Sequence, residues 1–156
     1  GLQEHDLREN IEDTLKLLSG ELKTRIRVHA EFGEKNRVRC YGSQINQVLM
    51  NILSNAAQAI ESDGDIWIST EASGENLEIH IKDNGKGMTP EEVGKVFDPF
   101  FTTKTVGEGL GLGLSICHGI VREHGGHIWA ESDPGEGSTF FIEFPVVGLA
   151  VPESDG

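Results

Sequence analysis

The sequence predicts a two-layer α+β domain, in which amphipathic helices pack against one face of a β-sheet. Two periodicities support this prediction. Hydrophobic residues recur at helical spacing in some segments and alternate with polar residues in others, in the order helix, strand, helix, strand, strand, long loop, helix, strand, strand. Each predicted helix is apolar along one side only, so that side must be buried against the sheet. A chain of 156 residues suits one domain with a substantial core.

The composition indicates a soluble protein that does not bind nucleic acid. Hydrophobic residues make up 37% of the chain and charged residues 25%, and the formal net charge is −13. This charge repels nucleic acid and anionic lipid, so a bound anion needs a local positive potential. No run approaches the roughly 18 apolar residues of a membrane span, and the N-terminus lacks a signal-peptide pattern. We therefore expect a cytoplasmic domain that is part of a longer protein, and a membrane anchor elsewhere in that protein is compatible with these observations.

Two helices and an intervening strand are predicted for the N-terminal half. The first helix covers residues 6–22, because leucine and isoleucine recur on one face. Residues 24–32 alternate between apolar and polar and predict a strand. Ser43 is a suitable N-cap for a long helix that ends near Ile60. The apolar stripe of this helix consists of Ile45, Val48, Leu49, Ile52, Leu53, Ala56 and Ile60.

The C-terminal half is predicted to contain four strands and one helix. By the same alternation, the strands cover residues 65–70, 76–83, 127–132 and 138–145. Residues 84 to about 109 lack any periodicity, and a loop of this length inside a compact domain is more often functional than not. A helix over residues 112–124 begins with several glycines. We assign residues 1–148 to the domain and residues 149–156 to a tail or linker.

The long second helix carries amides beside its apolar stripe. Asn51 and Asn55 are four residues apart, so their side chains project together. Asparagine is unfavourable inside helices, so two asparagines on one helix face need an explanation. One interpretation is a solvated helix face. The other is an oxygen ligand for a hard cation such as Mg²⁺, and this helix alone leaves both interpretations open.

The segment "DNGKGM", residues 83–88, places an acid at the end of a strand. A turn that uses positive φ angles at Asn84 and Gly85 would explain the segment by itself. However, Gly87 follows, and the long loop begins here. Glycines allow a backbone to approach a flat ligand closely. Asp83 is therefore a candidate catalytic acid, metal ligand, turn residue or hydrogen-bond acceptor for a ligand.

Two further segments in and after the loop suggest contacts with an anion. "GEGLGLGLS", residues 107–115, leads into a helix, and free N–H groups at a helix N-terminus attract phosphate. No strand immediately precedes this segment and the ending of a Walker motif is missing, so neither a dinucleotide-binding nor a P-loop fold is indicated. "FDPFFTTK", residues 97–104, places three phenylalanines in the loop, which predicts their burial. Lys104 offers a cation to a phosphate.

Four segments in this order resemble the ATP-binding catalytic domain of bacterial sensor histidine kinases, within the GHKL superfamily. "QVLMNILSNAAQAI" resembles the N box of that family, "DNGKGM" its first glycine box, "FDPFFTTK" its F box and "GLGLGLS" its second glycine box. "GEGSTFFIEFP" resembles the closing strand pair. The resemblance covers about residues 6–145, and "DPFFTTK" and "NAAQAI" are most similar to the subgroup with nitrogen-regulatory and oxygen-sensing kinases.

This resemblance implies a Bergerat-type fold: a mixed, mostly antiparallel sheet covered on one face by three helices, with ATP beneath a flexible lid of about residues 84–110. It implies that Asp83 accepts a hydrogen bond from the adenine amino group, and that Thr139 helps Asp83 to hold the adenine through a water molecule. It also implies that Asn55 ligates Mg²⁺, and that Asn51 and Lys104 face the phosphates. The other nucleotide-binding residues that it implies are Gly85, Gly87, Met88, Phe97, Gly109, Leu110, Gly111, Leu112, Gly113 and Leu114.

The resemblance further implies a protein histidine kinase rather than an ATPase. ATPases of this fold carry a glutamate at the place of Asn51, where a carboxylate can act as the base for an attacking water. An amide cannot accept that proton at neutral pH, whereas phosphoryl transfer relies chiefly on alignment and charge neutralisation. We therefore expect transfer of the γ-phosphate to a histidine on a separate dimerisation hairpin, with a response regulator as the downstream partner.

Some positions depart from the family pattern. Gln58 stands where many members have a lysine, so Lys104, Mg²⁺ and the helix terminus must neutralise more phosphate charge, and the lid is short. His5 resembles a phosphoacceptor motif, but Asn10 stands where that motif has a proline. We therefore place the phosphoacceptor histidine outside this chain. Because dimerisation in this family comes from the hairpin, the isolated domain is expected to be monomeric.

Two other functions stay open at this stage. A non-catalytic nucleotide sensor or interaction module could have the same fold, although every motif position is filled. A serine-directed kinase of the anti-sigma type is disfavoured, because such proteins resemble the pattern with the glutamate.

Overall fold

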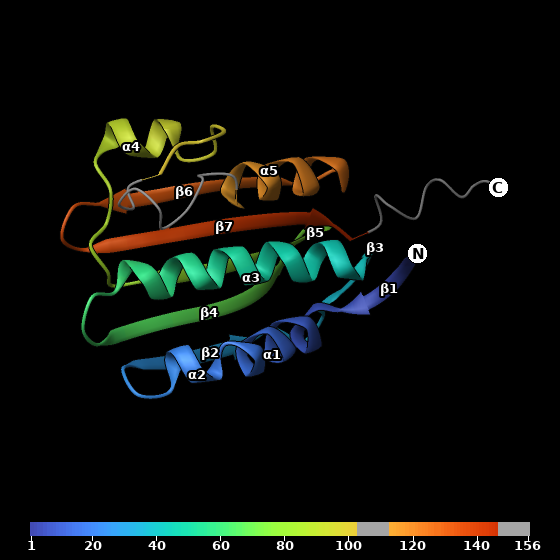
Figure 1. The fold of residues 1–156 in the computed structure, drawn as a ribbon. Coiled ribbons are helices and arrows are strands. Elements are labelled where there is room, and N and C mark those ends of the chain that lie inside the picture. Colours follow the sequence, from blue (N-terminus) through green and yellow to red (C-terminus); the bar gives the residue numbers. More distant parts are fainter. Residues whose placement is uncertain (103–112, 147–156) are drawn as a thin grey trace.

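A five-stranded sheet forms one layer of the domain (Figure 1). A computed structural model describes residues 1–102 and 113–146. The strand order is β2-β4-β5-β7-β6; β2 and β4 are parallel, and all other neighbours are antiparallel. The strands are β2 (Ile26–Phe32), β4 (Gly64–Ser73), β5 (Asn76–Asp83), β6 (His127–Asp133) and β7 (Gly137–Pro145).

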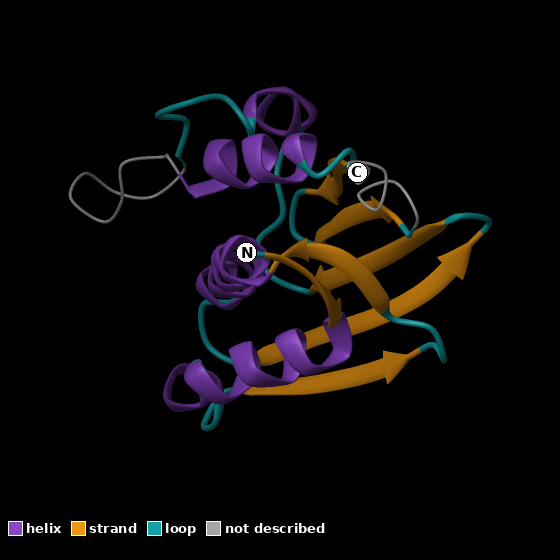
Figure 2. Ribbon diagram, turned by 90° about the vertical axis from the view of Figure 1, so that its right-hand side faces the viewer, coloured by secondary structure: helices purple, strands orange, loops and turns teal. Residues whose placement is uncertain are grey.

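The helices form the second layer, on one face of the sheet (Figure 2). The central helix α3 (Gly42–Ala59) packs between α1 (Leu7–Leu17) and α5 (Gly113–Glu123). The predicted α+β fold with a mixed, mostly antiparallel sheet is therefore confirmed. Two short helices, α2 (Ser19–Leu22) and α4 (Pro90–Lys95), complete the described helices. Within residues 1–102 and 113–146, no helix is both long and apolar enough to cross a membrane.

The core lies between the two layers and follows the predicted periodicities. Every residue of the apolar stripe predicted for the second helix is buried on α3 or directly after it. On β5, Leu77, Ile79 and Ile81 are 1% exposed or less, which confirms the inward face predicted for this strand. The apolar side of α3 and the apolar face of β5 are both buried between the two layers, so amphipathic helices can cover this sheet from one side.

A second, two-stranded sheet was not predicted. β1 (Leu2–Asp6) pairs antiparallel with β3 (Arg37–Tyr41); β1 leads directly into α1, and β3 leads directly into α3. Asp6 accepts a hydrogen bond from the N–H of Arg8 and so acts as the N-cap of α1. The predicted helix over residues 6–22 is also interrupted at Leu18, immediately before a serine and a glycine, which are weak helix formers.

The prediction of Ser43 as an N-cap is wrong. α3 begins at Gly42, and its N-cap residue Tyr41 makes no side-chain capping bond. β3 runs directly into the helix at this point, and the N–H of Tyr41 donates to Nε2 of His124 (3.2 Å). A side chain at position 42 would overlap the ring of His5, so a glycine fits this junction. His5 is thereby packed against the domain itself.

The long loop contains a short helix that the sequence analysis did not predict. Thr89 caps α4 through a capping box: its Oγ1 accepts from the N–H of Glu92 (3.1 Å), and Glu92 Oε1 accepts from the N–H of Thr89 (2.9 Å). Pro90 occupies the first helical position, where its missing N–H costs nothing. The threonine, proline and glutamate pattern is a known helix-start signal, so this element was predictable.

Candidate functional site

Asp83 is the last residue of β5, and only 1% of its surface is exposed. Its Oδ1 accepts a hydrogen bond from the N–H of Gly85 (2.8 Å), and the backbone of Ser138 also hydrogen-bonds to the carboxyl group. Burial raises the pKa of Asp83, and these two hydrogen bonds partly oppose the rise. A buried acceptor of this kind discriminates between a donor and an acceptor on a ligand, because an unpaired buried group is costly.

The expected partnership of Asp83 with Thr139 is wrong. In the register of β5 and β7, Asp83 lies opposite Ser138, whereas Thr139 lies opposite Lys82. Neighbouring residues of a strand face opposite sides of the sheet, so Thr139 faces away from the side that carries the helices. Ser138 belongs to the buried row of β7, and it is the hydroxyl that shares a face with Asp83.

Two serine hydroxyls beside Asp83 were missed in the sequence analysis. Ser138 Oγ lies 2.7 Å from Ser132 Oγ, and Ser132 Oγ donates to the carbonyl of Gly137 (3.0 Å). The N–H of Met88 donates to Ser132 Oγ (2.7 Å), which connects the start of the expected lid to β6 and β7. Counting back in steps of two along the apolar row of β7 would have identified Ser138. Nothing in the sequence singled out Ser132.

The glycines of "DNGKGM" are packed against protein backbone. A Cβ at Gly85 would overlap the carbonyl oxygen of Ala59, and a Cβ at Gly87, which has a φ of +71°, would overlap that of Asp133. The N–H of Lys86 donates to the same Ala59 carbonyl (2.9 Å). The close approach predicted for these glycines is thus made by the protein itself, which attaches the segment to the C-terminal end of α3.

Asn51 and Asn55 continue along α3 from this attachment point. Asn51, Asn55 and Ala59 are spaced by four residues, so they lie on one side of the helix. The Nδ2 of Asn51 donates to the carbonyl of Gly113 at the start of α5 (3.3 Å), and it lies 3.6 Å from Cys117 Sγ. Asn55 is half-buried, and its side chain makes no hydrogen bond with the residues that the structure describes.

The residues at Asn55 fit a hard cation that takes only one or two ligands from the protein and the others from water and a bound anion. Among the described residues, no group of three or more His, Cys, Asp or Glu side chains could hold a metal ion. A cation at Asn55 would therefore take the amide oxygen, water and the oxygens of an anionic ligand, which is a coordination typical of Mg²⁺.

The start of α5 lies beside Asn51. A Cβ at Gly113 would lie 3.6 Å from Asn51 Cγ, an ordinary contact, so this glycine is not required by packing within the described residues. Leu114 packs partly against the core. The other residues expected on the phosphate side lie outside the described residues: Lys104, Gly109, Leu110, Gly111 and Leu112.

The three phenylalanines after α4 have different environments. Phe97 packs edge-to-face on Phe140 with a centroid distance of 6.1 Å, and it lies 5.6 Å from the ring of His118. Phe101 is also partly buried against the core. Phe100 is 71% exposed and has a φ of +68°, which is uncommon outside glycine. The burial predicted for these rings therefore holds for two of the three.

Together, these residues form a site with two chemically different ends. Asp83, with its buried acceptor, lies beside the C-terminal end of α3, where the Ala59 carbonyl contacts Gly85 and Lys86. The two amides extend along the helix to the N-terminal end of α5, where the helix dipole favours an anion. The arrangement suits a ligand with a ring donor at one end and anionic groups at the other.

Comparisons with known proteins agree with this geometry. Residues 40–148 match the family of histidine kinase-, DNA gyrase B- and HSP90-like ATPases. The sensor histidine kinase ZraS of Escherichia coli K12 is 37% identical over 148 residues, covering 93% of this chain and 31% of ZraS. The catalytic domain of the histidine kinase ThkA has a TM-score of 0.84 at 35% identity, covering 94% of this chain and 96% of that domain. A structure of ThkA in complex with the response regulator protein TrrA has a TM-score of 0.80 at 33% identity, and the match covers 93% of this chain and 42% of the ThkA chain.

The chain therefore belongs to the family of histidine kinase-, DNA gyrase B- and HSP90-like ATPases. Within this family, it has the fold of the catalytic domain of sensor histidine kinases. It spans about a third of the length of the curated relatives that match most of it. The subgroup suggested by the sequence stays a prediction.

Proposed function

We propose that this chain binds Mg-ATP and transfers the γ-phosphate to a histidine on a separate phosphoacceptor hairpin, as the catalytic part of a two-component signalling kinase. One observation carries this proposal: the buried Asp83 acceptor lies at one end of α3 and the Asn51–Asn55 pair extends along it toward α5. The similarity to named sensor histidine kinases supports the same function.

Asp83 recognises the adenine base in this proposal. The adenine amino group is a donor, whereas guanine has a carbonyl acceptor at the same place, so a buried carboxylate favours adenine. The hydroxyl pair of Ser138 and Ser132 lies on the same side of the sheet and supplies further polar partners for a base or a bridging water. We assign to Ser138 the role that the sequence resemblance gave to Thr139.

Asn51 and Asn55 act at the phosphate end. Asn55 provides an amide oxygen to Mg²⁺, which would neutralise phosphate charge during transfer. Asn51 holds the first turn of α5 through the Gly113 carbonyl and offers no carboxylate to activate water. The site therefore positions ATP for attack by an incoming imidazole and disfavours hydrolysis.

The partners follow from this reaction. The nucleophilic histidine comes from a hairpin domain of the same full-length protein, and a response regulator receives the phosphoryl group. The structure of ThkA with TrrA supports a response regulator as a partner of this class of protein. We propose that the isolated domain is monomeric, works in the cytoplasm and does not bind nucleic acid, in keeping with its net charge of −13.

Calorimetric titration with a non-hydrolysable ATP analogue, with and without Mg²⁺, tests the binding part. Adenine-selective binding that is strengthened by Mg²⁺ is expected, with a GTP analogue as the control. The second part is tested by incubating the chain with ATP and a histidine hairpin, for which an acid-labile phosphoprotein is expected. Rapid hydrolysis without a hairpin would contradict the kinase assignment, and binding without any transfer would favour a nucleotide-sensing module.

The Asn55→Ala variant is expected to lose the Mg²⁺-dependent part of ATP-analogue affinity, by about tenfold or more, because it removes the proposed metal ligand. Binding without Mg²⁺ should change little. Gln58→Ala is the matched control, because Gln58 is an exposed amide on the same helix and donates to Ser54 Oγ (3.3 Å). Full Mg²⁺ dependence and full phosphotransfer in Asn55→Ala would make Asn55 a structural residue.

A further inference from the structure

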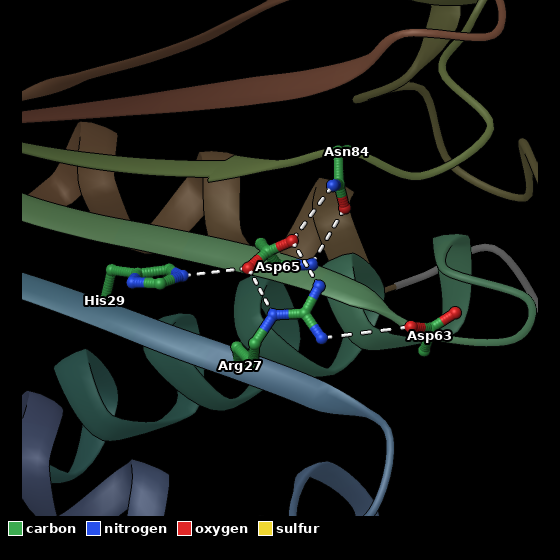
Figure 3. A network of polar contacts seen from close by, with 5 residues as sticks. All are labelled: Arg27, His29, Asp63, Asp65 and Asn84. Atoms are coloured by element: carbon green, nitrogen blue, oxygen red, sulfur yellow. Dashed lines mark hydrogen bonds and ion pairs between the residues drawn. The ribbon is translucent and has the colours of Figure 1, made fainter.

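Asn84, the residue between Asp83 and Gly85, is attached to Asp65 on β4 by three hydrogen bonds. Figure 3 shows the two that its side chain makes. Its Oδ1 accepts from the N–H of Asp65 (2.8 Å), and its Nδ2 donates to Asp65 Oδ2 (3.3 Å). The backbone N–H of Asn84 also donates to the carbonyl of Asp65 (3.4 Å). Asp65 therefore holds both the backbone and the side chain of Asn84, although Asn84 is exposed.

The carboxylate of Asp65 is itself held from several sides (Figure 3). Arg27 on β2 donates from Nε to Oδ1 and from a terminal nitrogen to Oδ2, both at 2.9 Å, and His29 Nε2 lies 2.8 Å from Oδ1. Bidentate pairing of this kind fixes the plane of a carboxylate. Arg27 above all, with His29, lowers the pKa of Asp65 to about 2, so this group stays ionised at neutral pH.

The orientation of Asn84 determines how Asp83 is presented. Asn84 forms one peptide group with Asp83 and another with Gly85. The Asn84–Gly85 peptide group carries the N–H that donates to Asp83 Oδ1. Gly85 has no side chain and constrains its own backbone weakly, so its direction depends on its neighbours. The bond from the Lys86 N–H to the Ala59 carbonyl holds Gly85 from one side, and Asn84 holds it from the other, so Asn84 contributes to fixing the donor that orients the Asp83 carboxyl group.

We propose that Asp65 is a positioning residue for base recognition, which acts through Asn84 to hold the Asp83–Gly85 backbone in the orientation that selects adenine. This inference rests on the proposed function of Asp83. A role in joining β2 to β4 would be redundant, because these strands are already paired along all seven residues of β2. The register of β4 with β5 ends at Asp83, whereas the Asp65 contacts reach one residue further, to Asn84.

Nucleotides that differ at one exocyclic group test this role. The affinity of the chain for a non-hydrolysable ATP analogue is compared with that for the inosine analogue, which has a carbonyl in place of the adenine amino group. In Asp65→Ala, the ATP-analogue affinity is expected to fall about fivefold, as for the loss of one net hydrogen bond, while the inosine-analogue affinity stays the same. The preference for adenine therefore falls by the same factor.

The matched control is Glu78→Ala. Glu78 Oε1 contacts His80 Nε2 at 2.9 Å on β5, so this variant also removes a carboxylate–imidazole contact from the sheet, but away from Asp83. Its adenine preference should equal that of the wild type. Asp65→Asn retains the shape of the side chain and replaces Asp65→Ala as the test variant if thermal unfolding shows that the alanine variant is not folded.

A double-variant cycle separates positioning from general stability. If Asp65 acts through Asn84, the combined Asp65→Ala and Asn84→Ala changes should reduce adenine preference no further than Asn84→Ala alone. Additive losses, or an unchanged preference in Asp65→Ala, would overturn the inference. A wild-type chain that does not distinguish the two nucleotides would instead overturn the proposed function of Asp83, so the two failures can be told apart.

Discussion

The Asp83→Asn variant is expected to bind the ATP analogue about 5–150-fold more weakly, which corresponds to the roughly 1–3 kcal/mol cost of an unpaired buried polar group. The Gly85 N–H is donated to Oδ1, so the amide oxygen of the variant is held at that position. The amide NH₂ group then faces the adenine amino group, and a donor meets a donor. The loss should be confined to nucleotides with an adenine base.

The same substitution should leave the free domain at least as stable as the wild type at neutral pH. Burial raises the pKa of Asp83 in the folded state above its unfolded value. The stability linked to such a group is fully present below the unfolded pKa and is lost as the pH rises through the folded pKa. Ionised Asp83 therefore destabilises the wild type at pH 7, and the amide removes this cost.

Two measurements check this prediction together. Calorimetry gives the ATP-analogue affinity of both proteins, and thermal unfolding without nucleotide compares their stability from about pH 4 upwards. The wild type should lose stability relative to Asp83→Asn as the pH rises. Unchanged ATP-analogue affinity in a folded variant would remove Asp83 from base recognition, and a large loss of stability at neutral pH would make it a structural residue.

Local periodicity explains why most of the fold was predictable. The buried stripe of α3 and the inward row of β5 are each set by residues close together in sequence. β1 and β3 were missed because β1 has a largely polar sequence, and its stability depends on pairing with residues about 35 positions away. β3 does alternate, with Val38 and Cys40 buried between exposed neighbours, but the pattern covers only five residues and its partner β1 does not match it in sequence.

The candidate site also combines residues that local sequence indicates with contacts between residues far apart in the chain. Asp83, Asn51 and Asn55 could be predicted as site residues because the chemistry of each is visible in a short motif. The choice of Thr139 over Ser138 was wrong because it followed the family motif and not strand alternation, which places Ser138 in the buried row of Phe140. The contacts of Asp65 join residues 19 to 38 positions apart, so no local pattern indicates them.

Gly87→Ala is expected to lower the free energy of unfolding much more than Gly74→Ala. Both glycines have positive φ angles, +71° and +64°, so an alanine at either position costs about 1–2 kcal/mol of backbone strain. At Gly74 there is open space around the added Cβ, but at Gly87 the Cβ would overlap the carbonyl of Asp133. A total of about 3 kcal/mol or more is therefore expected at Gly87.

The difference between the two variants isolates the steric contact that holds the start of the expected lid. To relieve the overlap, the backbone at Gly87 must move away from β6, and the hydrogen bond from the Met88 N–H to Ser132 is then lost. Because Ser132 also contacts Ser138 beside Asp83, ATP-analogue affinity should fall in Gly87→Ala and stay unchanged in Gly74→Ala. Urea unfolding and calorimetry measure the two effects. Equal destabilisation with equal affinities would mean that the segment relaxes freely, and that its attachment to β6 does not shape the base-binding end of the site.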